Sequence, residues 1–179
     1  ITTRQAVQFH WLEIGQIPDI FNRLEAVGLS SVGACGDITR NIVGNPIAGI
    51  DPNELFDTSG IVKEVFDFFQ NNEDFSNLPR KYKMSISTNL HNASNAEINC
   101  ISFTPAVKVL DGKEKQGFHL KIGGGLSARP FLAQTLDVFI EPERTLEVAI
   151  AVTTIFRDYG YREKRHLARL KFLMADWGP

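Results

Sequence analysis

The chain has 179 residues, of which 43% are hydrophobic, and this is enough apolar material for one compact domain with its own core. Nineteen basic and 21 acidic side chains leave a formal net charge of -2, so no overall positive field favours nucleic acid or an anionic membrane as a partner. No apolar run approaches the ~20 residues that span a bilayer, and no signal-peptide pattern opens the sequence, which predicts a cytoplasmic location.

The first thirty or so residues predict a strand followed by a helix. Residues 4–11 alternate between a polar set and a mostly apolar set, so one strand face would carry Arg4, Gln8 and His10. Pro18 near the start of the next segment and Gly28 just past its end are typical of a helix.

A glycine-rich stretch from Gly33 to Gly49 separates this helix from a second one. The second helix is predicted to be capped by Thr58 or Ser59, to carry apolar residues at helical spacing as far as Phe69, and to end in a polar loop over 71–74. The glycine-rich stretch contains neither a dinucleotide fingerprint nor a phosphate loop, so a nucleotide site is not supported.

Three extended segments follow and predict one sheet. They cover 84–88, 98–110 and 117–122, and a turn at Asp111-Gly112 separates the last two. A long helix begins near Glu141 and ends at Gly160, and its few polar positions predict that it is buried. An amphipathic helix from Arg162 to about Trp177 closes an α+β fold with a mixed, largely antiparallel sheet and helices packed on it.

The two cysteines are too far apart for a metal finger or a disulfide framework. Cys35 and Cys100 lie in no C-x-x-C pair, and Cys100 is expected to be a buried, reduced thiol. The histidines at 91, 119 and 166 have no acid or thiol at ligand spacing, so we expect surface or hydrogen-bonded histidines and no metal site.

Cations and hydrogen-bond donors recur in three separate segments, and together they predict an anion site. The first segment contributes Arg4, Gln8 and His10, the second contributes Arg40, and the third contributes Lys81 and Lys83. Such a set suits a flat ligand with several negative charges.

These three segments, followed by Gly123-Gly124-Gly125-Leu126-Ser127, occur in the same order in siroheme-dependent nitrite and sulfite reductases. The chain resembles this family from Thr2 to about Leu173. The resemblance implies the nitrite/sulfite reductase domain fold, with residues 1–30 ending a ferredoxin-like half-domain and residues 31–179 forming a siroheme-contacting domain packed with it. Since both ends interrupt predicted structure, we interpret the chain as a fragment of a longer protein.

The resemblance also assigns site residues. Arg40, Lys81 and Lys83 match family residues that face a small oxyanion on the open side of the iron, where cations hold the anion and stabilise charge as its N–O or S–O bonds break. Siroheme carries carboxylates on its rim, and each needs a cation or several N–H donors. The cofactor-binding residues implied are Arg4, Gln8, His10, Asn41, Arg80 and Gly124. The cationic group of Arg162, Arg165, Arg169 and Lys171 either helps to hold these carboxylates or simply solvates a helix.

As full-length protein, the family catalyses assimilatory six-electron reduction of sulfite to sulfide or nitrite to ammonia, with ferredoxin or a flavoprotein as electron donor. It also uses a 4Fe-4S cluster, which needs four cysteines and therefore cannot be ligated by this chain. We accordingly expect the isolated chain to be inactive and to bind siroheme weakly or not at all. Lysine at position 83 favours sulfite, whereas the segment 44–51 fits nitrite-type relatives equally well.

Two other interpretations stay open at this stage. The same residues could serve a non-catalytic tetrapyrrole- or anion-binding module, or they could be remnants in a purely structural domain. If the remaining half of a longer chain covers one side of the sheet, the isolated chain would expose apolar surface and self-associate.

Overall fold

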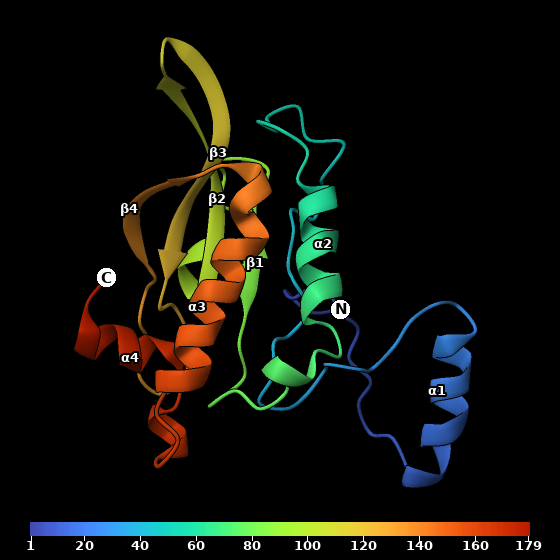
Figure 1. Cartoon of the computed structure of the whole chain (residues 1–179). Coiled ribbons are helices and arrows are strands. Elements are labelled where there is room, and N and C mark those ends of the chain that lie inside the picture. Colours follow the sequence, from blue (N-terminus) through green and yellow to red (C-terminus); the bar gives the residue numbers. More distant parts are fainter.

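The computed structural model describes all residues, 1–179. Its centre is a four-stranded sheet in the order β1-β2-β3-β4 (Figure 1). The strands are β1 (Met84–Ile86), β2 (Ile101–Leu110), β3 (Lys113–Ile122) and β4 (Gln134–Ile140). Strand β1 pairs with β2 in parallel, and the other two pairs are antiparallel, so the predicted α+β fold with a mixed, largely antiparallel sheet is confirmed.

Strands β2 and β3 form a long hairpin that extends beyond the rest of the sheet (Figure 1). Its two-residue loop consists of Asp111 and Gly112, with φ of 53° and 74°. Two positive φ values in succession match the right-handed twist of the strands, and aspartate followed by glycine adopts them readily. The turn predicted at this dipeptide is therefore confirmed.

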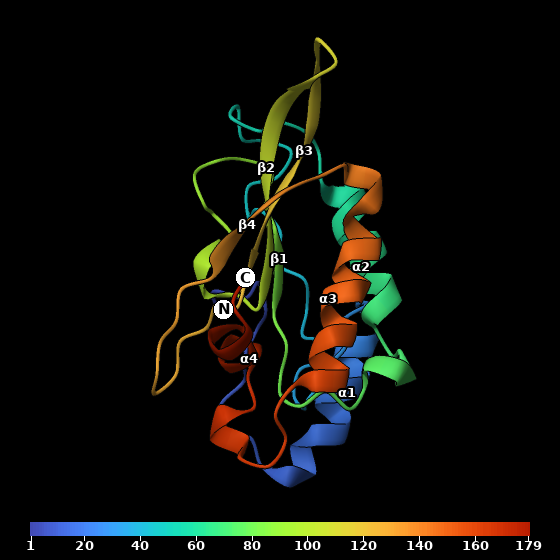
Figure 2. The same ribbon diagram turned by 60° about the vertical axis from the view of Figure 1, so that its left-hand side comes forward.

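Two helices cover one face of the sheet, namely α2 (Ser59–Phe69) and α3 (Thr145–Tyr159) (Figure 2). The core lies between them and the strands: Tyr82 stacks on Phe156 with ring centroids 5.4 Å apart, and Phe103 packs edge-on against Phe118. The backbone N–H of Ser59 donates to the Asp57 side chain at 2.8 Å, so Asp57, and not Thr58, supplies the capping oxygen of α2.

Short 3-10 turns connect these elements. They are η1 (Ile14–Gln16), η2 (Glu73–Phe75), η3 (Ala96–Ile98), η4 (Pro142–Arg144) and η5 (Arg165–Leu167). No helix has both the length and the apolar character needed to cross a membrane.

Three sequence predictions were wrong. Residues 4–11 form no strand, because Gln5 and Trp11 have φ of 53° and 60° and no neighbouring strand is available to pair with. The last helix, α4 (Leu170–Trp177), starts eight residues later than predicted, after η5. Helix α3 is only half-buried, with its core contacts at Ala149, Thr153 and Phe156. In addition, strand β4 was not predicted.

The first 32 residues contribute nothing fully buried, and helix α1 (Ile17–Glu25) stands apart from the sheet (Figure 1). Large apolar side chains on this segment are open to solvent, including Trp11 at 100%, Ile14 at 90% and Val27 at 70% exposure. The boundary at residue 30 and the self-association of the isolated chain stay predictions.

Candidate anion-binding site

The loop that carries Arg40 lies alongside the segment that carries the two lysines. The backbone N–H of Tyr82 donates to the Ile38 carbonyl at 2.9 Å, and the N–H of Arg40 donates to the Tyr82 carbonyl at 2.9 Å. A second parallel bridge joins Val43 to Ser85. Residues 38–43 thus extend the sheet beyond β1, and this brings Arg40 next to Lys81 and Lys83.

Alternation along an extended chain decides which way the lysines point. Tyr82 and Met84 are completely buried in the core. Because successive side chains of an extended segment point to opposite sides, Lys81 and Lys83 leave the core on the other side. The apolar residue between the two lysines therefore fixes their common direction.

A cavity of about 500 Å³ lies on this side of the molecule. Six of the residues that line it are arginines or lysines, and none is acidic. Its lining consists of Arg80, Lys81, Lys83, Ile98, Leu126, Ser127, Ala128, Arg129, Arg165, His166, Arg169 and Phe172. We call it the cation cavity.

Positive charge in the cation cavity is poorly compensated. Burial is the main reason that the pKa of Lys81 is lowered, and Arg169, Arg40 and Arg80 lower it further by repulsion. The pKa of Lys83 is lowered by burial and then by Arg4, Lys81 and Arg169. Asp37 is a nearby acid, but it is paired with Arg165 at 2.8 Å and with Arg80 at 3.4 Å. A bound anion would relieve this repulsion.

Two arginines beside the lysines have buried nitrogens without a partner. Arg169 is 8% exposed and donates through Nη2 to the Cys100 sulfur at 3.3 Å, while its Nε has no acceptor. Arg40 donates to the carbonyls of Ala34 and Gly36, and its Nε is likewise unpartnered. Buried donors without acceptors are costly, so these positions are suited to an incoming anionic group.

Arg4 is held by hydrogen bonds within the chain. Its guanidinium donates to the Asn41 carbonyl at 2.8 Å, to the Met84 carbonyl at 3.3 Å and to the Asn99 side chain. The Asn41 amide donates back to the Arg4 carbonyl. Burial lowers the pKa of Arg4 to about 10. Arg4 and Asn41 together attach the N-terminal segment to the sheet.

The structure brings some of the predicted residues together at the cation cavity, whereas others are not part of its lining. Arg80, Lys81 and Lys83 line the cation cavity, and Arg40 lies within repulsion range of Lys81. Gln8 and His10 are exposed on the N-terminal segment. Gly124 is buried, and a Cβ there would lie 2.3 Å from the Glu97 carbonyl oxygen, so the need for glycine is set by backbone packing.

Sequence reasoning missed Arg129 and His166, and it left the C-terminal cationic group undecided. That group divides in the structure: Arg165 and Arg169 line the cation cavity, whereas Arg162 donates to the Asn77 carbonyl at 2.8 Å. Arg129 lies two residues after the Gly123–Ser127 segment that was recognised. That position, and not any spacing of charges, was the signal that could have identified it.

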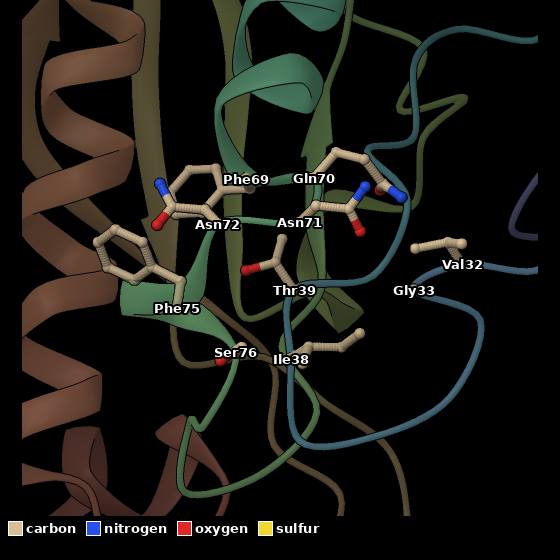
Figure 3. A pocket seen from close by; sticks show the side chains of 10 residues that line it. All are labelled: Val32, Gly33, Ile38, Thr39, Phe69, Gln70, Asn71, Asn72, Phe75 and Ser76. Carbon is tan, nitrogen blue, oxygen red and sulfur yellow. The ribbon is translucent and has the colours of Figure 1, made fainter.

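A second, smaller cavity of about 160 Å³ lies between the glycine-rich loop and the end of α2 (Figure 3). Its lining is uncharged and amide-rich: Val32, Gly33, Ile38, Thr39, Phe69, Gln70, Asn71, Asn72, Phe75 and Ser76. Without a cation it offers nothing comparable for an anion, so the anion-binding chemistry belongs to the cation cavity.

Comparison with protein families identifies the class to which this α+β fold and its cation cavity belong. The chain belongs to the family described as the nitrite and sulphite reductase 4Fe-4S domain, whose model matches residues 35–179. The family resemblance seen in the motifs is thereby confirmed.

Individual relatives include both sulfite and nitrite reductases. The chain is 43% identical over 178 residues to a "Sulfite reductase [ferredoxin] 2" of Mycolicibacterium paratuberculosis and 39% identical over 180 residues to the "Assimilatory ferredoxin-dependent nitrite reductase" of Haloferax mediterranei. Each match covers 99% of this chain and 31% of the relative. The chain therefore spans about a third of the length of these relatives.

Solved structures agree with the fold. The Mycobacterium tuberculosis NirA protein superposes with a TM-score of 0.88 at 42% identity, covering 99% of this chain and 32% of that one. A dissimilatory sulfite reductase, DsrI, has a TM-score of 0.69 at 10% identity over 93% of this chain and 56% of its own, which supports the fold alone.

The side chains present do not fit a 4Fe-4S cluster. The chain contains two cysteines, of which Cys35 is exposed and Cys100 is buried, and no three histidine, cysteine or acidic side chains are grouped as metal ligands. A cluster with four thiolate ligands cannot be held by these residues.

Proposed function

We propose that this chain forms the anion-binding portion of an assimilatory siroheme reductase, which reduces sulfite to sulfide or nitrite to ammonia with six electrons. The observation that carries the proposal is the convergence of six arginines and lysines on one cavity without an acidic residue in its lining. We further propose that residues 31–179 are the siroheme-contacting domain and residues 1–30 the end of a ferredoxin-like half-domain.

The donor set of the cation cavity fits a tetrapyrrole with several carboxylates. Three of the arginines that line the cavity come from the C-terminal part of the chain, namely Arg129, Arg165 and Arg169. Guanidinium groups bind carboxylates with paired hydrogen bonds. Siroheme, when bound, would supply the iron that accepts electrons and presents the anion. Arg4 and Asn41 would act indirectly, by fixing the N-terminal segment on which Gln8 and His10 lie.

Lys81, Lys83 and Arg40 would hold the oxyanion. Their charges balance its negative charge, and the lowered pKa values make the Nζ atoms of the two lysines better proton donors than an exposed lysine. Each oxygen lost as water needs two protons, so a donor placed against the substrate is useful at every step. Ferredoxin is the electron donor named for the relatives, and we propose a ferredoxin here too.

The assignment is tested by assaying the complete native protein with reduced ferredoxin and each anion. We expect turnover of both, and Lys83→Asn should change the ratio of kcat/KM values about tenfold in favour of nitrite. It removes one positive charge from the oxyanion site, and sulfite, which can carry two negative charges, loses more attraction than the singly charged nitrite. Lys63→Asn, on an exposed lysine of α2, is the matched control. Binding of siroheme or anions without turnover would instead indicate a non-catalytic binding module.

The pH dependence gives an independent check on the lysines. Their pKa values lie below the usual 10.5, so the charged form is lost as pH rises, at a lower pH than for an exposed lysine. We expect the KM for the anion to rise on the alkaline side, starting below pH 10.5. In Lys81→Ala the pKa of Lys83 loses one source of repulsion, so the KM rise should shift to higher pH. If the KM instead rose at the same pH as in the unaltered protein, the proposed repulsion between the two lysines would be contradicted.

A further inference from the structure

Lys171 is a buried lysine that the proposed reaction does not use. It is 1% exposed and lies in the first turn of α4, where a solvated helix face was one of the two interpretations of its charge. Burial is the main reason that its pKa is lowered, with Arg169 adding to the effect. A buried ammonium needs a complete set of acceptors, so its surroundings show what it does.

The ammonium of Lys171 is enclosed by three carbonyl oxygens of one short loop. Nζ donates to the Leu126 carbonyl at 2.7 Å, to the Gly125 carbonyl at 3.2 Å and to the Arg129 carbonyl. An ammonium has three N–H donors and here finds three acceptors. The rings of Phe131 and Phe172 lie on its other sides, with centroids 5.5 Å and 5.1 Å from Nζ.

That loop has little else to hold it. Gly125 and Phe131 exchange two backbone hydrogen bonds, of 2.9 Å and 3.0 Å, and residues 126–130 between them are all exposed. Ser127 has a φ of 93°, which is unusual for a residue with a side chain. The Lys171 ammonium therefore gathers carbonyls that would otherwise face water, and it does so across more than 40 residues of sequence.

The same loop forms one wall of the cation cavity. Leu126, Ser127, Ala128 and Arg129 all line it, and Lys81 and Lys83 line it as well. Directly before α4, Arg169 packs against Gly125, where an added Cβ would lie 3.0 Å from Nη2. At the start of α4, Arg169 thus lines the cavity, and Lys171 binds the loop that forms one of the cavity walls.

We propose that Lys171 is a positioning residue: it anchors the Leu126–Arg129 loop, and thereby sets the width of the cation cavity and the place of Arg129, without itself contacting the bound anion. The proposal rests on the function proposed above only in assigning the cavity to anions. Loss of the ammonium should release the loop and weaken anion binding more than it slows the chemical step.

The test compares Lys171→Met and Lys171→Ala with the unaltered complete native protein. Methionine keeps most of the side-chain volume and so guards against loss of folding. We expect the KM for sulfite or nitrite to rise about tenfold with a smaller change in kcat. Hydrogen exchange at the Gly125 and Phe131 amides should become about tenfold faster, while amides in the centre of β2 keep their protection.

Chemical rescue makes the test specific. Lys171→Ala removes the equivalent of n-propylammonium, so adding n-propylammonium should restore both loop protection and KM, whereas 1-propanol, which has no charge, and tetramethylammonium, which has no N–H donor, should not. The proposal would be overturned if hydrogen exchange in the loop were unchanged in the Lys171 variants. It would also be overturned if these variants left the KM unchanged while Lys81→Met raised it. If Lys81→Met has no effect on either anion, the function proposed for the cavity fails, and loop exchange still decides whether Lys171 is the anchor.

Discussion

Replacing Lys81 and Lys83 together with methionine is expected to lower kcat/KM for anion reduction about a thousandfold in the complete native protein. Both ammonium groups leave the core on the side of the cation cavity, where no acidic side chain lines the walls. Removing a single preorganised donor from such a site typically costs about a hundredfold to a thousandfold, and two donors that act on one anion do not contribute additively.

The same double variant should keep or gain stability. The pKa values of both lysines are lowered, which means that folding disfavours their charged forms. Methionine preserves the packing of the stems and removes the repulsion from Arg169 and Arg4. Measured on the same preparations, kcat/KM should therefore fall while the unfolding temperature stays the same or rises, and Lys63→Met should leave both unchanged. Loss of activity together with a lower unfolding temperature would indicate that the lysines serve the fold.

Local sequence patterns predicted those parts of the fold whose partners are close in the chain. Helix α2 and the β2–β3 hairpin follow from helical periodicity and from the Asp111-Gly112 turn. These features depend on interactions within a few residues, which the sequence displays directly.

The features that were missed depend on distant partners. Strand β4 is exposed at most of its positions, so it shows no alternation, and it exists because β3 offers it an edge. Residues 4–11 show the alternation but have no such edge. Arg169 and Lys171 resemble charges on a solvated helix, yet their acceptors are Cys100 and the carbonyls of residues 125–129. No local pattern contains that information.

Gly124→Ala is expected to reduce the free energy of unfolding by about 3 kcal/mol or more. A Cβ at this position would lie 2.3 Å from the carbonyl oxygen of Glu97 and 2.6 Å from that of Asn99. Both obstacles are backbone atoms, so neither can move aside by changing a rotamer. The Glu97 carbonyl is also fixed by the backbone N–H of Ala133 at 2.8 Å. Denaturant unfolding of the complete native protein would measure the loss.

Gly60→Ala is the matched control, because Gly60 lies in α2 with no atom within 4 Å of an added Cβ. This substitution should increase the free energy of unfolding by about 0.5–1 kcal/mol, since alanine loses less backbone entropy than glycine when a helix forms. The comparison also separates two roles for Gly124. If it serves backbone packing, Gly124→Ala loses siroheme and stability together, because the adjoining Gly125–Arg129 loop moves. A variant with native stability that no longer retains siroheme would show instead that Gly124 contacts the cofactor directly.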